Sequence, residues 1–249
     1  MEVCVDCVTS AVNAEAGGAS RLELCSALSE GGLTPSEGFL RVVKSLVSIP
    51  VFVMIRPRRG LDFVYSKDEV RIMEFDIKRL KDSGADGFVF GALTPDRKVD
   101  KEVCSSLLQA ASPLPCTFHR AFDIVKNPLE ELETVISLGF KRILTSGLKQ
   151  NAYEGVSVIK DLIKRSQGLI SVMPGAGIAE KNLEVILKET GAKEFHASAR
   201  KPINAINSCN DEDLNVSMGS SDSDFSLLVT DSNLVKEMVK ISNLVWSES

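Results

Sequence analysis

The chain has 249 residues, with 29 basic and 34 acidic side chains and a formal net charge of -5, and 44% of its residues are hydrophobic. This composition is typical of a globular protein and excludes a disordered chain, a collagen-like fibre and a small disulfide scaffold. The acidic balance argues against nucleic-acid binding, which needs a basic face. The length suits one large domain, and α/β barrels often reach this size.

The first eight residues, MEVCVDCV, indicate where the protein resides. They contain no basic residue, and Glu2 and Asp6 interrupt the apolar stretch, so we expect no signal peptide. No apolar run in the chain approaches the roughly 18 residues of a membrane span. We therefore expect a cytoplasmic protein, in which the six cysteines stay reduced.

Short β-rich runs alternate with longer helical patterns along the whole chain. The predicted strands are 2–7, 21–26, 50–56, 87–93, 116–122, 142–147, 170–175 and 194–198. The clearest helical patterns are 68–83, 127–138, 179–190 and 232–245. Eight such units without a linker predict a single α/β domain over 1–249, a (β/α)8 TIM barrel. An open doubly wound sheet is the alternative.

The segment 201–226 interrupts this rhythm, because it is rich in Ser, Asn and Asp. It follows the eighth predicted strand, so we expect a long polar loop at the C-terminal face of the barrel. Two interpretations stay open for this loop: a flexible surface insertion, or a lid over a site.

Alternation along each strand predicts which side chains face the barrel interior, because the apolar set must face the helices. The predicted inward set is Glu2, Cys4, Asp6, Arg21, Glu23, Cys25, Phe52, Met54, Arg56, Thr117, His119, Thr145, Ser171, Met173, Glu194, His196 and Ser198. This interior is more polar than the Val, Ile and Leu layers of a purely structural barrel. The charges indicate either a buried salt-bridge network or a ligand site at the C-terminal mouth.

Two cysteines form a candidate metal pair. Cys4 and Cys25 point inward from neighbouring strands, which lie about 4.8 Å apart in a sheet. Cu(I) prefers thiolate and thioether ligands and accepts imidazole, and Met54 and Met173 add thioethers. Packing is the alternative role. No metal role is expected for Cys7, which faces the other side of the strand, for Cys104 and Cys116, which pack, or for Cys209, which lies in the polar loop.

Glycine-containing turns after the seventh and eighth strands form a candidate anion site. Barrels commonly bind phosphate at this position, through backbone N–H groups. The candidate residues are Gly175, Gly177, Ser198 and Arg200, with Arg56 and Arg120 nearby.

The same mouth holds candidate acid–base groups. His119 could act as a general base with Asp123 or Glu23 as its partner. The candidate catalytic residues are Glu23, Arg56, His119, Asp123 and His196. An isomerase, lyase or phosphatase acting on a small anionic or phosphorylated metabolite is therefore the alternative to a copper-binding protein.

The chain also resembles a known family. It is similar to the CutC family of copper homeostasis proteins in the segments MEVCVD, NAEAGGASRLELCSALSEGGLTPS, PVFVMIRPRRGLDFVYS, GADGFVFGALT, TFHRAFD, LGFKRILTSG, VMPGAGI and EFHASAR. The resemblance implies a TIM barrel, a cytoplasmic and also nuclear location, a homodimer or homotetramer, and Cu(I) binding by Cys4 and Cys25. Cys7 and the 201–226 loop depart from the family pattern.

Overall fold

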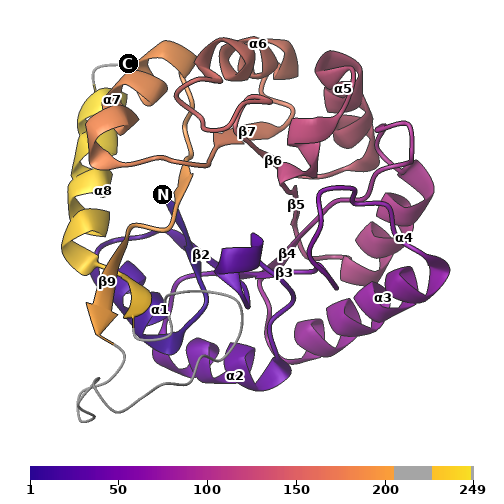
Figure 1. Cartoon of the computed structure of the whole chain (residues 1–249), viewed down its shortest axis with the longest axis horizontal. Helices are drawn as coiled ribbons and strands as arrows, with labels where there is room; N and C mark the ends of the chain where they lie inside the picture. The colour runs from indigo at the N-terminus through magenta and orange to yellow at the C-terminus, as the bar shows by residue number, and fades with distance from the viewer. Residues whose placement is uncertain (205–225, 248–249) are drawn as a thin grey trace, which may run out of the picture.

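A computed structural model describes residues 1–204 and 226–247 of the chain. Eight parallel strands form a nearly closed barrel, and helices surround it (Figure 1). The strands are β1 (Glu2–Val5), β2 (Arg21–Leu24), β3 (Val51–Met54), β4 (Gly87–Phe90), β5 (Cys116–Phe118), β6 (Arg142–Thr145), β7 (Ser171–Pro174) and β8 (His196–Ala197). The prediction of a (β/α)8 barrel is thus confirmed.

The helices around the barrel include all four that the sequence predicted, and the observed bounds of those four differ from the prediction by at most two residues. The helices are α1 (Val8–Ala16), α2 (Glu37–Leu46), α3 (Lys67–Asp82), α4 (Lys101–Ala111), α5 (Pro128–Leu138), α6 (Val156–Ser166), α7 (Glu180–Thr190) and α8 (Ser232–Ser247). Local chemistry sets their ends: Ser66 and Glu69 form a capping box at the start of α3, and Gly139 ends α5 with a left-handed φ of 97°. Among the described residues, no helix has both the length and the apolar character to cross a membrane.

The hydrogen-bonded ladder runs from β7 through β6, β5, β4, β3, β2 and β1 to β8, so β7 and β8 stand at its two ends. The register of β1 and β2 places Cys4 beside Glu23 and Val5 beside Leu24. The amide of Cys25 donates to the carbonyl of Val5 at 2.9 Å. The first two strands therefore bring their predicted inward residues to neighbouring positions.

The main hydrophobic core lies between the sheet and the helices. Side chains predicted to face outward, such as Val3, Leu22 and Val53, are fully buried in it. A smaller apolar cluster of Cys25, Phe52, Met54 and Val89 is separate from this core. Apolar packing thus secures the helices against the strands, and polar groups take most of the interior.

A network of ion pairs links the amino-terminal ends of the strands. Arg21 donates to Glu2 at 2.5 Å and to Glu194 at 2.6 Å, and Arg142 donates to Glu194 at 2.7 Å. The guanidinium groups of Arg21 and Arg142 lie 5.1 and 5.4 Å from the centroid of the Phe52 ring. The charges at this end of the barrel are therefore paired, as one of the two interpretations of the inward charges predicted.

The orientation predicted for β6 is wrong. Leu144 lines the interior cavity and Arg142 joins the ion-pair network, whereas Ile143 packs in the outer core. Thr145 instead donates to Asp123 at 2.6 Å at the end of the strand. The prediction failed because it assigned the small polar residue to the interior, although Arg142 occupies it and pairs there with the half-buried Glu194.

The polar segment after β8 also differs from the prediction at its two ends. Arg200–Asn204 forms β9 and Ser226–Thr230 forms β10, and the two strands pair antiparallel. The predicted loop of 201–226 therefore includes strand residues at both ends. The rest of it, with Cys209, lies outside the described residues.

Candidate functional site

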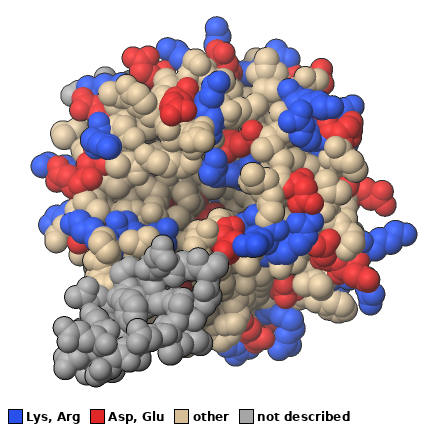
Figure 2. All heavy atoms as spheres, in the orientation of Figure 1, with Lys and Arg blue, Asp and Glu red and all other residues tan. Residues whose placement is uncertain are grey.

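A cavity of about 590 Å³ opens at the carboxyl ends of the barrel strands. Figure 2 shows the hollow at the centre of this face, with basic side chains beside it. Nine of the eleven candidate metal, anion-binding and catalytic residues line the cavity: Cys4, Glu23, Arg56, His119, Asp123, Gly177, His196, Ser198 and Arg200. Cys25 and Gly175 are not part of its lining. The volume is within the range of small-molecule sites, roughly 300–1,000 Å³.

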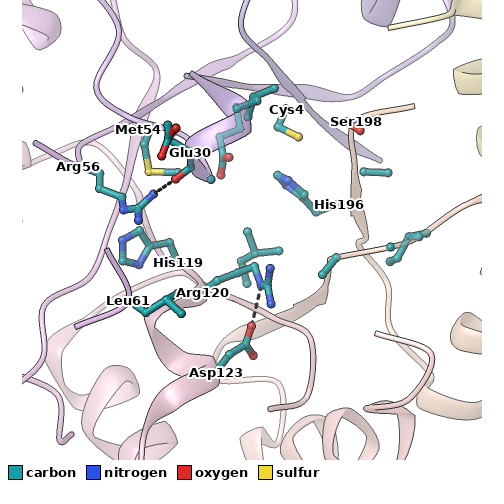
Figure 3. Close-up of a pocket in the computed structure, with 18 of the residues that line it drawn as sticks. Cys4, Glu30, Met54, Arg56, Leu61, His119, Arg120, Asp123, His196 and Ser198 are labelled. Atoms are coloured by element: carbon teal, nitrogen blue, oxygen red, sulfur yellow. Dashed lines mark hydrogen bonds and ion pairs between the residues drawn. The ribbon is translucent and has the colours of Figure 1, made fainter. Parts of the chain in front are cut away.

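Cys4 and Cys25 occupy different positions relative to this cavity. The Cys4 side chain points toward the cavity from β1 (Figure 3), and only 8% of the residue is exposed. Cys25 is fully buried, and its thiol lies 3.4 Å from the Glu23 carboxylate as a hydrogen-bond donor. Burial and the adjacent Glu23 raise the pKa of Cys25 well above the ordinary value of a thiol. Both cysteines are free thiols.

Three further ligand atoms converge between the two cysteines and the ion-pair network. The carboxylates of Glu2 and Glu23 and the imidazole of His196 offer atoms that all lie within 4.8 Å of one another. His196 Nδ1 lies 2.8 Å from Glu2, whereas Oε2 of Glu23 has no hydrogen-bond partner. A metal ion could thus find oxygen and nitrogen ligands beside the cysteines.

The buried environment shifts the pKa values of these three residues in different directions. Burial raises the pKa of Glu23 to about 7. Burial also acts against the charged form of Glu2, but Arg21 and His196 outweigh it and lower the pKa of Glu2 to about 2. For His196 burial is outweighed by Cys4, Glu23 and Glu2, so its pKa rises well above the ordinary value. The cluster therefore holds charge of both signs away from water.

His119 lies on the opposite wall of the cavity, and its predicted pairing is wrong. Its Nδ1 accepts a hydrogen bond from the amide of Ala121 at 3.3 Å, and its Nε2 has no partner. Asp123 instead accepts hydrogen bonds from Arg120, Thr145 and the amide of Ser146, at 2.7, 2.6 and 2.9 Å. The short helix at Arg120–Ile124 turns Asp123 away from the imidazole and towards β6.

The predicted anion-binding residues divide between the cavity and its surroundings. Gly177, Ser198 and Arg200 line the cavity, and Arg200 lies 3.9 Å from Asp6. A Cβ atom at Gly175 would lie 2.5 Å from a methyl group of Leu144, so close packing accounts for the glycine there. Gly177 has a φ of +67°, which favours glycine.

Several lining residues were not among the candidates from the sequence, and Phe63 and Leu144 are two of them. Phe63 adopts a φ of 50°, which is unusual for an aromatic residue, and its ring stands 4.9 Å from that of His119. In the segment RPRRGLDFVY, which contains Phe63, only Arg56 was singled out from the sequence. An aromatic residue three positions after Gly60 was the one signal that the sequence offered for Phe63.

Comparison with known proteins places the chain in a family. The sequence model of the CutC family matches residues 1–201. Copper homeostasis protein cutC homologs from Homo sapiens and Mus musculus are 54% and 55% identical over 242 and 244 residues. These alignments cover 97% of this chain and 88% and 89% of the relatives.

A solved structure agrees with these sequence matches. The CutC protein from Streptococcus agalactiae superimposes with a TM-score of 0.76 at 36% identity, covering 79% of this chain and 97% of that one. The resemblance noted in the sequence is thus confirmed over nearly the whole chain. The protein belongs to the CutC family.

Proposed function

We propose that this protein binds Cu(I) inside the barrel through Cys4 and Cys25 and acts in copper homeostasis in the cytoplasm. The observation that carries the proposal is the position of two free, buried thiols, one on β1 and one directly after β2, on segments whose backbones are hydrogen-bonded to each other. Relatives at 54% and 55% identity bear the name copper homeostasis protein, which supports the choice of metal.

The ligand types near the two cysteines suit Cu(I) better than a harder ion. Cu(I) prefers thiolate and thioether sulfur and accepts imidazole nitrogen. Met54 belongs to the same apolar cluster as Cys25, and His196 interacts with Cys4. Cys4 and Met54 both line the cavity, so an ion that enters the barrel mouth has access to thiol and thioether sulfur.

A competition titration with a chromophoric Cu(I) chelator tests the proposal on the reduced protein without oxygen. We expect one tightly bound Cu(I) per chain, and loss of this equivalent in the Cys4→Ser/Cys25→Ser double variant. Thiolate ligands are essential to such affinity, since serine does not replace them as a soft ligand. Unchanged stoichiometry and affinity in the double variant would refute the proposal.

Cys7→Ser is the matched control variant. Cys7 caps α1 by accepting a hydrogen bond from the amide of Ser10, and serine is a good N-cap residue. This variant should keep the fold, remove a thiol from the same part of the chain, and bind Cu(I) like the wild type. If Cys7→Ser lost the bound Cu(I), Cys7 would be a ligand and the proposed pair of Cys4 and Cys25 would be wrong.

The proposal keeps two expectations from the sequence. We expect a homodimer or homotetramer, which sedimentation velocity measures directly. We also expect the protein in the cytoplasm and the nucleus, which fractionation of cells that express it tests.

A further inference from the structure

Arg56 is a buried cation with no carboxylate partner among the residues that the structure describes. Only 5% of Arg56 is exposed, and its guanidinium donates to the backbone carbonyls of Glu30, Gly32 and Gly60 at 2.8, 3.0 and 2.8 Å. Within residues 1–204 and 226–247 it forms no ion pair, and its Nε has no hydrogen-bond partner. A buried charge is stable only when it is compensated, so the neutral carbonyls leave this requirement unmet.

His119 presents a second donor without a partner. Its Nδ1 accepts a hydrogen bond from the Ala121 amide, and a neutral imidazole that accepts at one nitrogen carries its hydrogen on the other. Nε2 is therefore an N–H donor, and it is buried and unpaired in a residue that is 3% exposed and lines the cavity. Such a donor needs an acceptor, and the described part of the chain supplies none.

Phe63 holds these two donors on one wall. The Arg56 guanidinium lies 5.3 Å from the centroid of the Phe63 ring, and the His119 ring meets it edge-on at 4.9 Å. Phe63 is fixed with a φ of 50° while its carbonyl accepts from the amide of Leu93 at 2.8 Å. Backbone conformations of this kind cost energy and are often found at functional sites. Figure 3 shows Arg56 and His119 together on this side and Cys4 and His196 opposite them.

We propose that the wall formed by Arg56 and His119 binds the acidic group of a small hydroxylated organic anion, a carboxylate or a phosphate monoester. An anionic oxygen is the acceptor that would both pair with the guanidinium and accept from the imidazole N–H. Across the cavity, Oε2 of Glu23 lacks a partner, and a ligand hydroxyl can donate to it. The cavity of about 590 Å³ has room for a molecule of this size.

This site is distinct from the proposed copper pair, and within the predicted acid–base and anion residues of the mouth it selects the wall of Arg56 and His119. The cysteines lie on β1 and at the end of β2, whereas Arg56 follows β3 and His119 follows β5. The turn at Gly177 and the Ser198–Arg200 segment, where the sequence predicted anion binding, form another part of the lining. Copper binding and anion binding can therefore fail independently in an experiment.

Calorimetric titration of the apo, reduced protein tests the proposal with defined probes. Glycerol 3-phosphate and lactate each carry an acidic group and a hydroxyl, whereas inorganic phosphate and acetate carry only the acidic group. We expect at least one hydroxylated probe to bind, and more tightly than the simple ion of its class. Absence of binding by all four probes at concentrations up to about 20 mM would refute the proposal.

Two substitutions of His119 separate binding from folding. Asn retains an acceptor near the position of Nδ1 and so keeps the contact with Ala121, but it removes the N–H at Nε2. Gln places an amide N–H near Nε2. We expect His119→Asn to reduce the affinity for the anion roughly tenfold, because a hydrogen bond to a charged group is lost. His119→Gln should bind the anion with most of the wild-type affinity. Equal affinity in His119→Asn and the wild type would overturn the proposal.

Arg56→Lys and Arg59→Ala complete the series. Lysine at position 56 keeps the positive charge but lacks the planar guanidinium that binds an acidic group with two N–H groups, so the affinity for the anion should fall. Arg59 is exposed and does not line the cavity, so Arg59→Ala should bind the anion like the wild type. Binding that survives in Arg56→Lys and His119→Asn but is lost in Arg200→Ala would move the anion to the opposite rim and refute the assignment. The Cys4→Ser/Cys25→Ser protein should bind the anion normally, and His119→Asn should bind Cu(I) normally.

Discussion

Glu2 and His196 connect the ion pairs at the base of the barrel with the cavity at its mouth. One carboxylate oxygen of Glu2 lies 2.8 Å from His196 Nδ1, and the other accepts from Arg21 at 2.5 Å. The Glu2 side chain has no exposed surface, whereas His196 lines the cavity. A single buried carboxylate therefore fixes both the position of the imidazole and the charge of the layer beneath it.

Replacing Glu2 with glutamine should destabilise the protein strongly. The amide keeps the shape of the side chain but removes the negative charge between Arg21 and His196. Breaking a buried ion pair from one side costs about 3 kcal/mol or more, and Arg21 would keep only Glu194 as its carboxylate partner. Urea unfolding at neutral pH measures this as a lower midpoint, with the slope unchanged if only stability differs.

Glu133→Gln serves as the control for this substitution. Glu133 pairs with Arg165 on the surface, and both side chains are 58% exposed. Exposed ion pairs contribute little, so the urea midpoint of this variant should stay close to that of the wild type. If Glu2→Gln were as stable as Glu133→Gln, Glu2 would not be the charged link described above.

Gly175→Ala distinguishes a packing role from an anion-binding role for this glycine. The added Cβ would lie 2.5 Å from a Leu144 methyl and 3.4 Å from His196 Cβ. Overpacking of this kind costs about 1–3 kcal/mol, so we expect a lower free energy of unfolding. The matched control is Gly38→Ala in α2, where nothing lies closer than 4.0 Å, and where alanine should stabilise by up to about 1 kcal/mol. A Gly175→Ala protein as stable as the wild type would instead favour the interpretation that the glycine leaves room for a ligand.

The fold could be predicted because apolar side chains alternate with more polar ones along several of the strands, although both sets are buried. Outward residues such as Val3, Leu24 and Val51 are apolar and fully buried, so alternation alone identified both the strands and the polar interior. Alternation gave the wrong orientation for β6, where the side chain of Arg142 points into the barrel. Its partner Glu194 is 52 positions away in the chain, and a pattern confined to one strand cannot reveal such a partner.

The candidate site was predicted in its composition but not in its pairings. Nine of the proposed residues share one cavity because strand ends meet at the mouth of a barrel. The partner of His119 could not be predicted, because a short helix after β5 turns Asp123 towards Thr145. The left-handed backbone of Phe63 was equally hidden, since residue type favours the opposite conformation.

The stability of the protein should depend on pH through His119. Burial and the nearby Arg56 lower the pKa of His119 to about 3, whereas an unfolded histidine has a pKa near 6.5. Between these values the unfolded state binds more protons, so stability is complete above pH 6.5 and falls as the pH decreases towards 3. By pH 5 the wild type should have lost about 2 kcal/mol through this residue. His119→Asn keeps the contact with Ala121 and has no group that titrates at this position. Between pH 7.5 and pH 5.0, the free energy of unfolding of the variant should therefore rise relative to that of the wild type by about 2 kcal/mol. Urea unfolding of both proteins at pH 7.5, 6.0 and 5.0 measures it, and parallel pH profiles would show that His119 is accessible to protons in the folded state.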